Sequence, residues 1–500
     1  MESALPFDLA IVGGGINGTG IARDAAGRGL RVLLVEQHDL ASGTSSASSK
    51  LIHGGLRYLE QGWLRLVREA LLEREVMLRM APHLIRPMRL VLPVEPDMRP
   101  AWMLRLGLLV YDHLGGRKLL PATRALALAD DPLGAPLKRQ YRRGFEYSDC
   151  RADDSRLVVL NAVDAAERGA TVRTRARCIG VERGKLWRLV LDVRGRRDVA
   201  TARILVNATG PWIRLFTQQV LRDSSPVPVR LVKGSHIVVR RLFEHDRGYV
   251  FQARDGRVVF ALPFERDFTL IGTTDQAFSG DPAGVTAVAD EIAYLCVAAN
   301  RYLRFPISPA DVVWSFAGVR ALHDDGSRRA QDVSRDYLIE LDSRAQEAAL
   351  LTVHGGKITT YRRVAEQALD RIAQVVTAGP AWTANAQLPG GEFRHDELDR
   401  LVGDTRRSRP FLSAGLARRL VRAYGTRIDR VLGTARSMPD LGPCLGADLT
   451  AAEVRYLMER EWAQTEDDVL WRRSKLGLRF SRDEREGLAK FMAGAVGARG

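Results

Sequence analysis

The sequence predicts an α/β protein with a dinucleotide-binding unit at the N-terminus, an antiparallel sheet in the middle and a helical C-terminal region. Three observations support this fold class. Residues 8–36 read as a strand, a glycine-rich turn, a helix and a second strand. Short apolar runs between residues 229 and 340 are typical of an antiparallel sheet, and residues 393–500 are rich in Arg and Leu at helical spacing. A chain of 500 residues is long enough for several such domains.

The glycine-rich turn has the pattern Gly13-x-Gly15-x-x-Gly18, and it lies between an apolar strand and a helix. In this pattern Gly13 permits the tight turn and Gly15 lets the backbone approach a pyrophosphate. Gly18 allows close packing between helix and strand. The spacing therefore predicts a dinucleotide site, although three glycines alone would also fit a purely structural turn.

The residues around this turn complete the predicted site. The helix begins near Ile16 and Asn17, where its N-terminus offers amide donors and a partial positive charge to phosphates. Glu36 ends the second strand, where its carboxylate can accept hydrogen bonds from a ribose diol and disfavours a 2′-phosphate.

Two later segments favour FAD over NAD, although each alone is also typical of an ordinary turn. The strand of ILVNATGPW (204–212) runs into a turn at Gly210 that can pass close to a bound dinucleotide. GGKITTY (355–361) begins a helix, and its backbone amides can face the oxygens of a flavin ring. The predicted cofactor contacts of this second segment are Gly355, Gly356, Lys357, Ile358 and Thr359.

Composition narrows the possible partners. The chain has 75 Lys and Arg against 60 Asp and Glu, a net charge of +15 that can attract nucleic acid, anionic lipid or a small anionic substrate. No zinc finger, helix-turn-helix or RNA-binding pattern is present, so no nucleic-acid partner is expected. The four cysteines are far apart, which gives no support to a metal site or a redox dithiol. The N-terminal residues do not read as a secretory signal, so a cytoplasmic location is expected.

Several segments are candidates for contact with a membrane. The most apolar stretch, residues 102–114, is shorter than the roughly 20 residues that a spanning helix needs, so any membrane contact must be peripheral. Residues 412–424 and 471–480 mix apolar and basic side chains. They can dock on an anionic leaflet, or they can be packed helices with a solvated basic face.

Taken together, these segments resemble the bacterial FAD-dependent glycerol-3-phosphate dehydrogenases of the glycine/D-amino-acid oxidase superfamily over nearly the whole chain. The longest matching segment is TSSASSKLIHGGLRYLE (44–60). Other matching segments are IVGGGINGTGIARDAAGRGL, RGFEYSDCRADDSRLV, LVNATGPW, LVKGSHIVV, IGTTD, GVRALHDD, GGKITTYR, PAWT and LPGG. Ala321 and His323 depart from the pattern of the family, which favours Pro and Cys there, so fine specificity stays open.

The resemblance implies FAD as cofactor, a homo-oligomer, expected to be a dimer, at the inner face of the cytoplasmic membrane, and ubiquinone as electron acceptor. No motif for attachment of a flavin to histidine is evident in the sequence, so the FAD is expected to be noncovalent. It also implies three domains. The expected ranges are 1–81, 150–228 and 345–378 for a discontinuous Rossmann-type FAD-binding domain, 82–149 and 229–344 for an antiparallel-sheet substrate domain, and 390–500 for a C-terminal helical cap domain.

The substrate that the resemblance implies, glycerol 3-phosphate, carries close to two negative charges at pH 7 because the second pKa of a phosphate monoester is about 6. A buried site must offset that charge with cations. Arg57, Arg320 and Lys357 lie in matching segments and are the predicted phosphate clamp. Tyr58 can donate a further hydrogen bond to a phosphate or hydroxyl oxygen.

Oxidation of an alcohol also needs a base for the hydroxyl proton. Histidine, with an ordinary pKa of about 6.5, suits this role. His236 begins a strand of the predicted substrate domain and is the predicted base, with His53 and His354 as rivals.

The hydroxyl-rich loop is expected to surround the flavin and to hold its pyrophosphate and ribityl oxygens. Its predicted contacts are Thr44, Ser45, Ser46, Ser48, Ser49, Lys50, His53 and Gly54. Other functions stay open at this point: an amine or amino-acid oxidase of the same superfamily, a catalytically silent flavoprotein, and an NAD-linked dehydrogenase.

Overall fold

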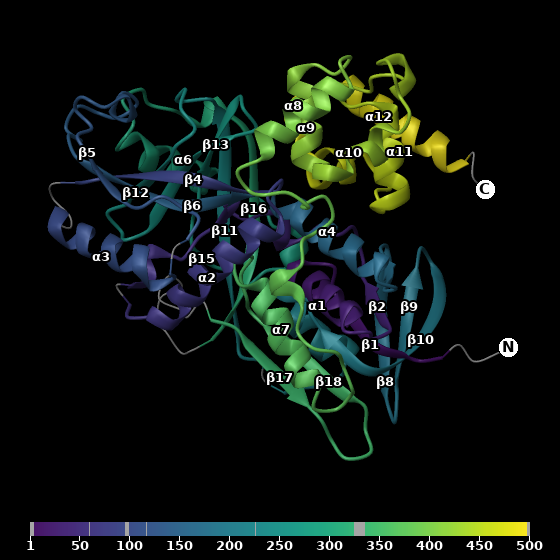
Figure 1. Ribbon diagram of the computed structural model, residues 1–500. Helices are drawn as coiled ribbons and strands as arrows, with labels where there is room; N and C mark the ends of the chain where they lie inside the picture. Colours follow the sequence, from purple (N-terminus) through teal and green to yellow (C-terminus); the bar gives the residue numbers. More distant parts are fainter. Residues whose placement is uncertain are drawn as a thin grey trace.

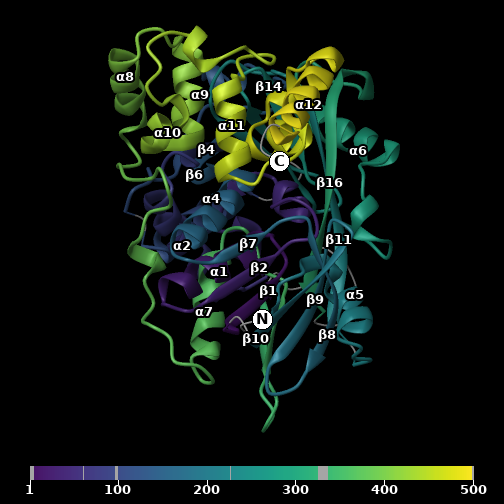
Figure 2. The ribbon, with the colours of Figure 1, turned by 90° about the vertical axis from the view of Figure 1, so that its right-hand side faces the viewer.

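A computed structural model describes residues 5–59, 61–95, 100–116, 118–225, 227–324 and 336–497. Two sheets lie beside each other, and the C-terminal helices form a separate cluster at the top of both views (Figures 1 and 2). Glu60 and Asp325, which end two of the matching segments, lie outside the described residues.

The first sheet has strands in the order β17-β18-β10-β1-β2-β7, with β9 paired to β10 and β8 to β9. The strands β18, β10, β1, β2 and β7 run parallel, so their carboxyl ends share one edge. The strands of this sheet are β1 (Phe7–Val12), β2 (Val32–Val35), β7 (Thr171–Arg173), β8 (Ala176–Arg183), β9 (Trp187–Val193), β10 (Arg196–Asn207), β17 (Leu338–Asp342) and β18 (Ala349–His354).

Three helices, α1 (Ile16–Gly27), α4 (Asp154–Glu167) and α7 (Tyr361–Ile372), pack beside one another along this sheet (Figure 1). Leu9 of β1 and Val32 of β2 are fully buried against this layer, as expected for strands covered on both faces. The predicted strand, turn, helix and strand of residues 8–36 are confirmed as β1, α1 and β2.

The second sheet has the order β15-β11-β14-β13-β12-β4-β6-β3, with β16 paired to β11 and β5 to β6. Its neighbours are antiparallel except for β12 and β4. The strands of this sheet are β3 (Leu51–Ile52), β4 (Ile85–Pro93), β5 (Arg124–Leu126), β6 (Gly144–Ala152), β11 (Val229–Arg240), β12 (Gly248–Gln252), β13 (Val258–Phe264), β14 (Phe268–Gly272), β15 (Gln276–Ala277) and β16 (Val312–His323). The helices beside it are α2 (Leu64–Met80), α3 (Ala101–Leu114) and α6 (Ala289–Asn300), and the short α5 (Ile213–Leu215) follows β10.

Part of this sheet is not recognisable from the local sequence. Residues 82–150 contain many prolines and aromatic residues and show no clear strand pattern, yet they form β4, α3, β5 and most of β6. The polar residues that hide the strand pattern are paired across strands: Arg89 donates to the carboxylate of Glu146 at 3.2 Å. Two strands also cross the predicted domain ranges, because β3 pairs in the second sheet and β17 in the first.

The C-terminal region is helical, as predicted. Leu416, Leu420 and Tyr424, the apolar side of the basic segment 412–424, are buried in its core. Its helices are α8 (Leu398–Ser408), α9 (Ala414–Tyr424), α10 (Ile428–Leu432), α11 (Ala451–Arg460) and α12 (Arg482–Gly497).

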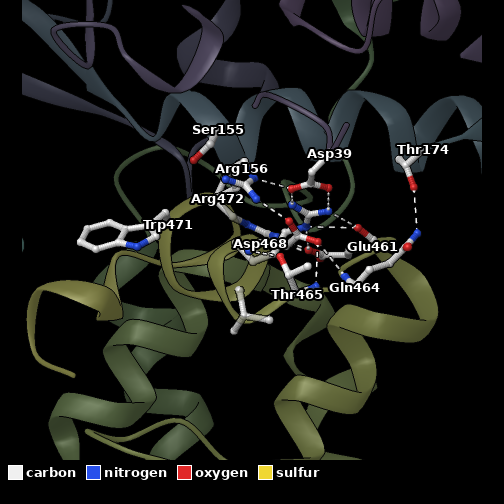
Figure 3. A network of polar contacts seen from close by, with 12 residues as sticks. Asp39, Ser155, Arg156, Thr174, Glu461, Gln464, Thr465, Asp468, Trp471 and Arg472 are labelled. Carbon is white, nitrogen blue, oxygen red and sulfur yellow. Dashed lines mark hydrogen bonds and ion pairs between the residues drawn. The ribbon is translucent and has the colours of Figure 1, made fainter. Parts of the chain in front are cut away.

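Buried ion pairs join this helical domain to the first sheet (Figure 3). Arg473 lies 2.7 Å from Asp39, and both side chains are fully buried. Arg472 also reaches Asp39, at 2.5 Å, and Arg156 of α4 pairs with buried Glu461. Arg472 and Arg473 of segment 471–480 therefore face the interior. This favours a packed segment over one that docks on a membrane.

Two arginines of α9 are also paired with acids of the helical domain. Arg419 lies 2.7 Å from buried Glu453, whereas Arg418 lies 2.8 Å from Asp399 in an exposed pair. For residues 412–424 too, a helix packed within its domain is therefore favoured over a helix that docks on a membrane.

Replacing Asp39 by Asn tests the junction. We expect a clear drop in the urea midpoint, because removing one partner of a buried ion pair leaves an uncompensated charge and costs about 3–5 kcal/mol. The matched control is Glu486→Gln, which breaks the exposed pair with Arg482 and should cost less than about 1 kcal/mol. Equal midpoints for the two variants would contradict this role of Asp39.

Candidate active site

A cavity of about 660 Å³ lies between the two sheets. The start of α1, the loop 44–49 and the residues before α7 form one side, and strands of the second sheet form the other. The predicted site residues that line it are Ile16, Thr44, Ser45, Ser48, Ser49, His53, Arg57, Tyr58, Arg320, Gly356, Lys357, Ile358 and Thr359.

The glycine-rich turn leads to this cavity, and its glycines are required by close contacts. Gly13 has φ +118°, and a Cβ there would lie 2.4 Å from the carbonyl oxygen of Ala208. A Cβ on Gly18 would lie 1.9 Å from the carbonyl oxygen of Gly13, so any side chain would push helix and turn apart. Gly15 is less crowded: its nearest neighbour would be Ser45 Oγ, at 3.1 Å.

The start of α1 carries an unused acceptor. Asn17 donates through Nδ2 to the carbonyl of Gly355 at 3.0 Å, while its Oδ1 is buried without a partner among the described residues. The neighbouring Gly356 has φ +94°, so its backbone approaches Asn17 without a side chain. A ligand with hydroxyl or ring N–H donors would satisfy this oxygen, which fits a flavin dinucleotide.

Glu36 lies beside the turn, as predicted. Its carboxylate accepts hydrogen bonds from the backbone N–H of Gly14 at 2.7 Å and of His38 at 2.8 Å. Burial raises the pKa of Glu36 above its ordinary value, although these hydrogen bonds oppose the shift. This is the position at which a ribose diol is bound in dinucleotide folds.

Hydrogen bonds fix the hydroxyl-rich loop. Thr44 donates to the carbonyl of Val319 at 2.5 Å, and Ser48 donates to Asp154 at 2.7 Å. Ser45 Oγ accepts from the N–H of Ile16 at 3.0 Å, at the N-terminus of α1.

Two residues of this loop do not line the cavity. Lys50 lies 2.8 Å from Asp154, so its charge is compensated there, and the expectation that it adds charge beside the flavin is not supported. The hydroxyl of Ser46 donates to the carbonyl of Gly43 at 3.3 Å.

The four predicted substrate residues meet in the cavity. Arg320 lies 2.5 Å from Asp275, and its side chain is 32% exposed, so the guanidinium is both positioned and accessible. The ammonium of Lys357 lies 4.1 Å from the ring centre of Tyr58, and Arg57 donates to the carbonyl of Gly256 at 3.3 Å. The cavity is thus lined by three cations and a phenol, with Arg320 on the side of the second sheet and Lys357 on the opposite side.

The histidines are placed differently from the prediction. His236 is buried and does not line the cavity: its ring stacks on Phe316 at 4.8 Å, and its Nε2 contacts Ser49 Oγ at 2.9 Å. Phe316 is the residue opposite His236 on neighbouring β16, so the two rings stack on the same face of the sheet, and this pairing cannot be recognised from the pattern of one strand. His53 does line the cavity, whereas His354 contacts Glu340 at 2.7 Å, away from it.

Both of the histidines nearest the cavity favour the neutral form. Burial, followed by the charges of Lys357 and Arg320, lowers the pKa of His53 to about 4. Burial and the charge of Arg320 lower the pKa of His236 well below its ordinary value. A neutral imidazole can accept a proton.

The other predicted contacts are backbone positions. Gly54 donates its N–H to Tyr111 at 2.8 Å, and Gly210 has φ +57° with open space around it. Thr359 Oγ1 accepts from the N–H of His53 at 3.4 Å.

The sequence reasoning missed an apolar wall of the cavity. Met103, Leu106 and Val110 of α3 line it, together with Phe260. The apolar residues of 102–114 recur at helical spacing, which was the available signal, and the same pattern also fits a helix in contact with a membrane. Within the described ranges, no group of three or more His, Cys, Asp or Glu residues is suited to hold a metal.

Comparison with known proteins agrees with this geometry. The profile of the family described as FAD dependent oxidoreductase matches residues 8–362, and that of the C-terminal domain of alpha-glycerophosphate oxidase matches residues 381–497. Glycerol-3-phosphate dehydrogenase of Pseudomonas aeruginosa is 51% identical over 97% of this chain and 95% of its own length. D-erythritol 1-phosphate dehydrogenase of Brucella abortus is 48% identical over 98% of both chains.

A solved structure gives the same result. The glycerol-3-phosphate dehydrogenase of Bacillus halodurans, complexed with FAD, superposes with a TM-score of 0.79 at 29% identity, over 99% of this chain and 92% of that one. Because a family profile covers most of the chain and close relatives match it nearly end to end, the chain belongs to the FAD-dependent oxidoreductases, with FAD as its cofactor, and carries the C-terminal domain of alpha-glycerophosphate oxidase.

Proposed function

We propose that this chain oxidises sn-glycerol 3-phosphate to dihydroxyacetone phosphate and that ubiquinone accepts the electrons. The observation that carries the proposal is the shared cavity in which Arg57, Arg320 and Lys357 lie with His53. A dianionic phosphate needs this density of cations, and Arg offers it a planar fork of donors. An amino-acid oxidase would need one cation for a carboxylate, so three cations favour the phosphate.

The remaining chemistry concerns the central carbon of the substrate. When bound, FAD accepts the hydride that leaves this carbon. The hydroxyl proton must leave as well, and His53 is the base that we propose, because it lines the cavity and is neutral. His236, the base that the sequence suggested, contacts the cavity only through Ser49 and is assigned a positioning role.

The names of the relatives support the substrate class. One acts on glycerol 3-phosphate and the other on D-erythritol 1-phosphate, and both substrates are polyol monophosphates. The choice of glycerol 3-phosphate is the narrower part of the proposal, since the clamp recognises the phosphate that both share. Ala321 and His323 follow Arg320 on β16 and are candidates for residues that distinguish glycerol 3-phosphate from other polyol monophosphates.

The exposed face of α3 supports the membrane part of the proposal. Trp102, Leu106 and Leu109 are 66%, 53% and 54% exposed and recur at helical spacing. Within the described ranges, no helix has the length and apolarity to cross a bilayer. We place α3 at the surface of the inner leaflet, where the apolar wall that it shares with the cavity offers ubiquinone a route to the flavin. A homodimer, peripherally bound from the cytoplasmic side, completes the proposal.

The substrate assignment is tested by anaerobic flavin spectra of the purified protein. Glycerol 3-phosphate should bleach the parent flavin, whereas sarcosine and D-amino acids should not, and a quinone analogue should restore the colour. Arg320→Ala should keep FAD but lose about 10²- to 10³-fold in kcat/KM, because truncating one partner of a buried charged contact costs about 2–5 kcal/mol. The double variant with Asp275→Asn should recover part of this loss, since Asp275 otherwise repels the phosphate. Bleaching by an amino acid, or unchanged kinetics in Arg320→Ala, would overturn the assignment.

The base is tested by the pH dependence of catalysis. His53→Asn should slow flavin reduction about 10²- to 10⁴-fold, the usual effect of losing a general base. Because the pKa of His53 is about 4, its neutral form persists above pH 5 and is lost as the pH falls through 4. The kcat/KM of the parent, corrected for the fraction of dianionic substrate, should therefore fall only as the pH approaches 4. His236→Asn should change the rate less and keep this profile; the reverse order of the two variants would restore His236 as the base.

Membrane contact is tested by Trp102→Glu with Leu109→Glu, two residues that do not line the cavity. We expect loss of co-sedimentation with phosphatidylglycerol vesicles and slower reduction of a long-chain quinone, with unchanged reduction of a soluble dye. Val297→Glu on α6, where Val297 is 70% exposed, is the matched control. Vesicle binding that survives the double variant would exclude α3 as the docking surface.

A further inference from the structure

A second cavity, of about 320 Å³, lies where the helical domain meets both sheets. It is separate from the active-site cavity, and its lining comes from three parts of the fold. Lys50 and Asp153 flank the first α/β layer, Arg86 and Arg151 belong to the second sheet, and Arg422 belongs to the helical domain.

The lining is strongly cationic. Ten arginines and lysines face four carboxylates around this small space. Several of the cations are compensated by acids: Arg473 pairs with Asp39, and Arg419 pairs with Glu453. The excess of positive charge therefore rests on the remaining members of the cluster.

Arg86 and Arg422 carry this excess. Neither guanidinium forms an ion pair or hydrogen bond within the part of the chain that the structure describes, and Arg86 Nε is buried without a partner. Lys475, in the same lining, contacts only a hydroxyl, Ser155 Oγ at 2.8 Å, and a backbone carbonyl, that of Trp471. These three cations thus share one cavity, and none of them has a carboxylate within ion-pair distance.

The protonation equilibria around the cavity agree with a strong positive potential. Burial, followed by the charge of Arg151, lowers the pKa of Arg422 to about 10. Burial and the charge of Arg422 lower the pKa of Arg86 as well. For Glu265 the sign is opposite: burial alone would raise its pKa, yet the charges of Arg151 and Arg422 lower it.

Uncompensated buried charge is costly, and proteins normally offset it with a partner. The three unpaired cations share the cavity with the carboxylate of Asp153, which leaves an excess of about two positive charges. A matching anion has about two negative charges and fits a space at the lower end of the usual range for ligand pockets. A phosphate group meets both conditions, and its oxygens match the donor forks of two arginines.

We propose that this cavity binds a small phosphate-bearing dianion, held between Arg86 and Arg422 with Lys475 as a third contact. Because its donors come from the second sheet and from the helical domain, the bound anion fastens these two parts together. The site also borders the active site through one loop: Lys50 lines this cavity, while Ser48 and Ser49 line the active-site cavity.

The test is a calorimetric titration of the FAD-bound protein with inorganic phosphate, at an ionic strength held constant with chloride. If the clamp of the active site also binds phosphate, the parent should bind two phosphates per chain. Arg422→Gln should bind one, with the lost site weakened at least tenfold, because a charged hydrogen bond contributes about 1.5–3 kcal/mol. Arg320→Ala should lose only the other site, so that failure of the active-site assignment and failure of this proposal give different stoichiometries. Arg86→Gln removes the contact that comes from the second sheet, and it should weaken the same phosphate site as Arg422→Gln.

Thermal unfolding gives an independent readout. Without phosphate, Arg422→Gln should melt higher than the parent because it removes a repelling charge, and Arg422→Glu should melt higher still because it supplies the missing anion from the chain. Neither should respond to phosphate beyond the effect of the remaining site. Arg436→Gln removes an exposed arginine of the same domain and should behave as the parent. An undiminished phosphate site in both Arg422→Gln and Arg86→Gln, or equal loss in Arg436→Gln, would overturn the proposal.

Discussion

Compensation of buried charge is the constraint on which this structure depends. The chain carries a net charge of +15, and its interior contains fully buried arginines, a residue that proteins almost never bury completely unless it is paired. Arg473 is tolerated because Asp39 faces it, and Arg156 because Glu461 does. These pairs connect the helical domain to the first α/β layer (Figure 3), so the position of that domain follows from where the acids lie.

The same constraint distinguishes the two cavities from the packed interior. At the junction of the helical domain each buried arginine contacts an acid of the chain, as Arg473 contacts Asp39. Around the active-site cavity Arg320 has Asp275, yet it stays accessible beside Lys357, and the phosphate of a substrate would complete the balance. Around the smaller cavity Arg86 and Arg422 have no carboxylate of the described residues within ion-pair distance, and an external anion takes that role in our proposal.

Local patterns made the fold and much of the site predictable, whereas long-range pairing was not. The turn from Gly13 to Gly18 is encoded within six neighbouring residues, so its geometry could be foreseen. The clamp residues lay in recognisable segments, and they do meet in one cavity, although their roles are still predictions. The direction of His236 depends on its packing against β16, and the partner of Lys50 lies 104 residues away. Neither contact can be recognised from the residues next to it in the sequence. The same holds for the strands within residues 82–150, whose polar side chains are paired across strands.

The pair between Asp39 and Arg473 has a consequence for biosynthesis. The two residues are separated by 434 positions, so Asp39 emerges from the ribosome long before its partner is translated. The central strand β1 likewise waits for β10 and the sheet for β18, late in the chain. Vectorial synthesis therefore cannot complete the N-terminal layer on its own. The nascent polypeptide must therefore hold buried Asp39 without its partner until Arg473 has left the exit tunnel, long after the last strand of the first sheet has been made.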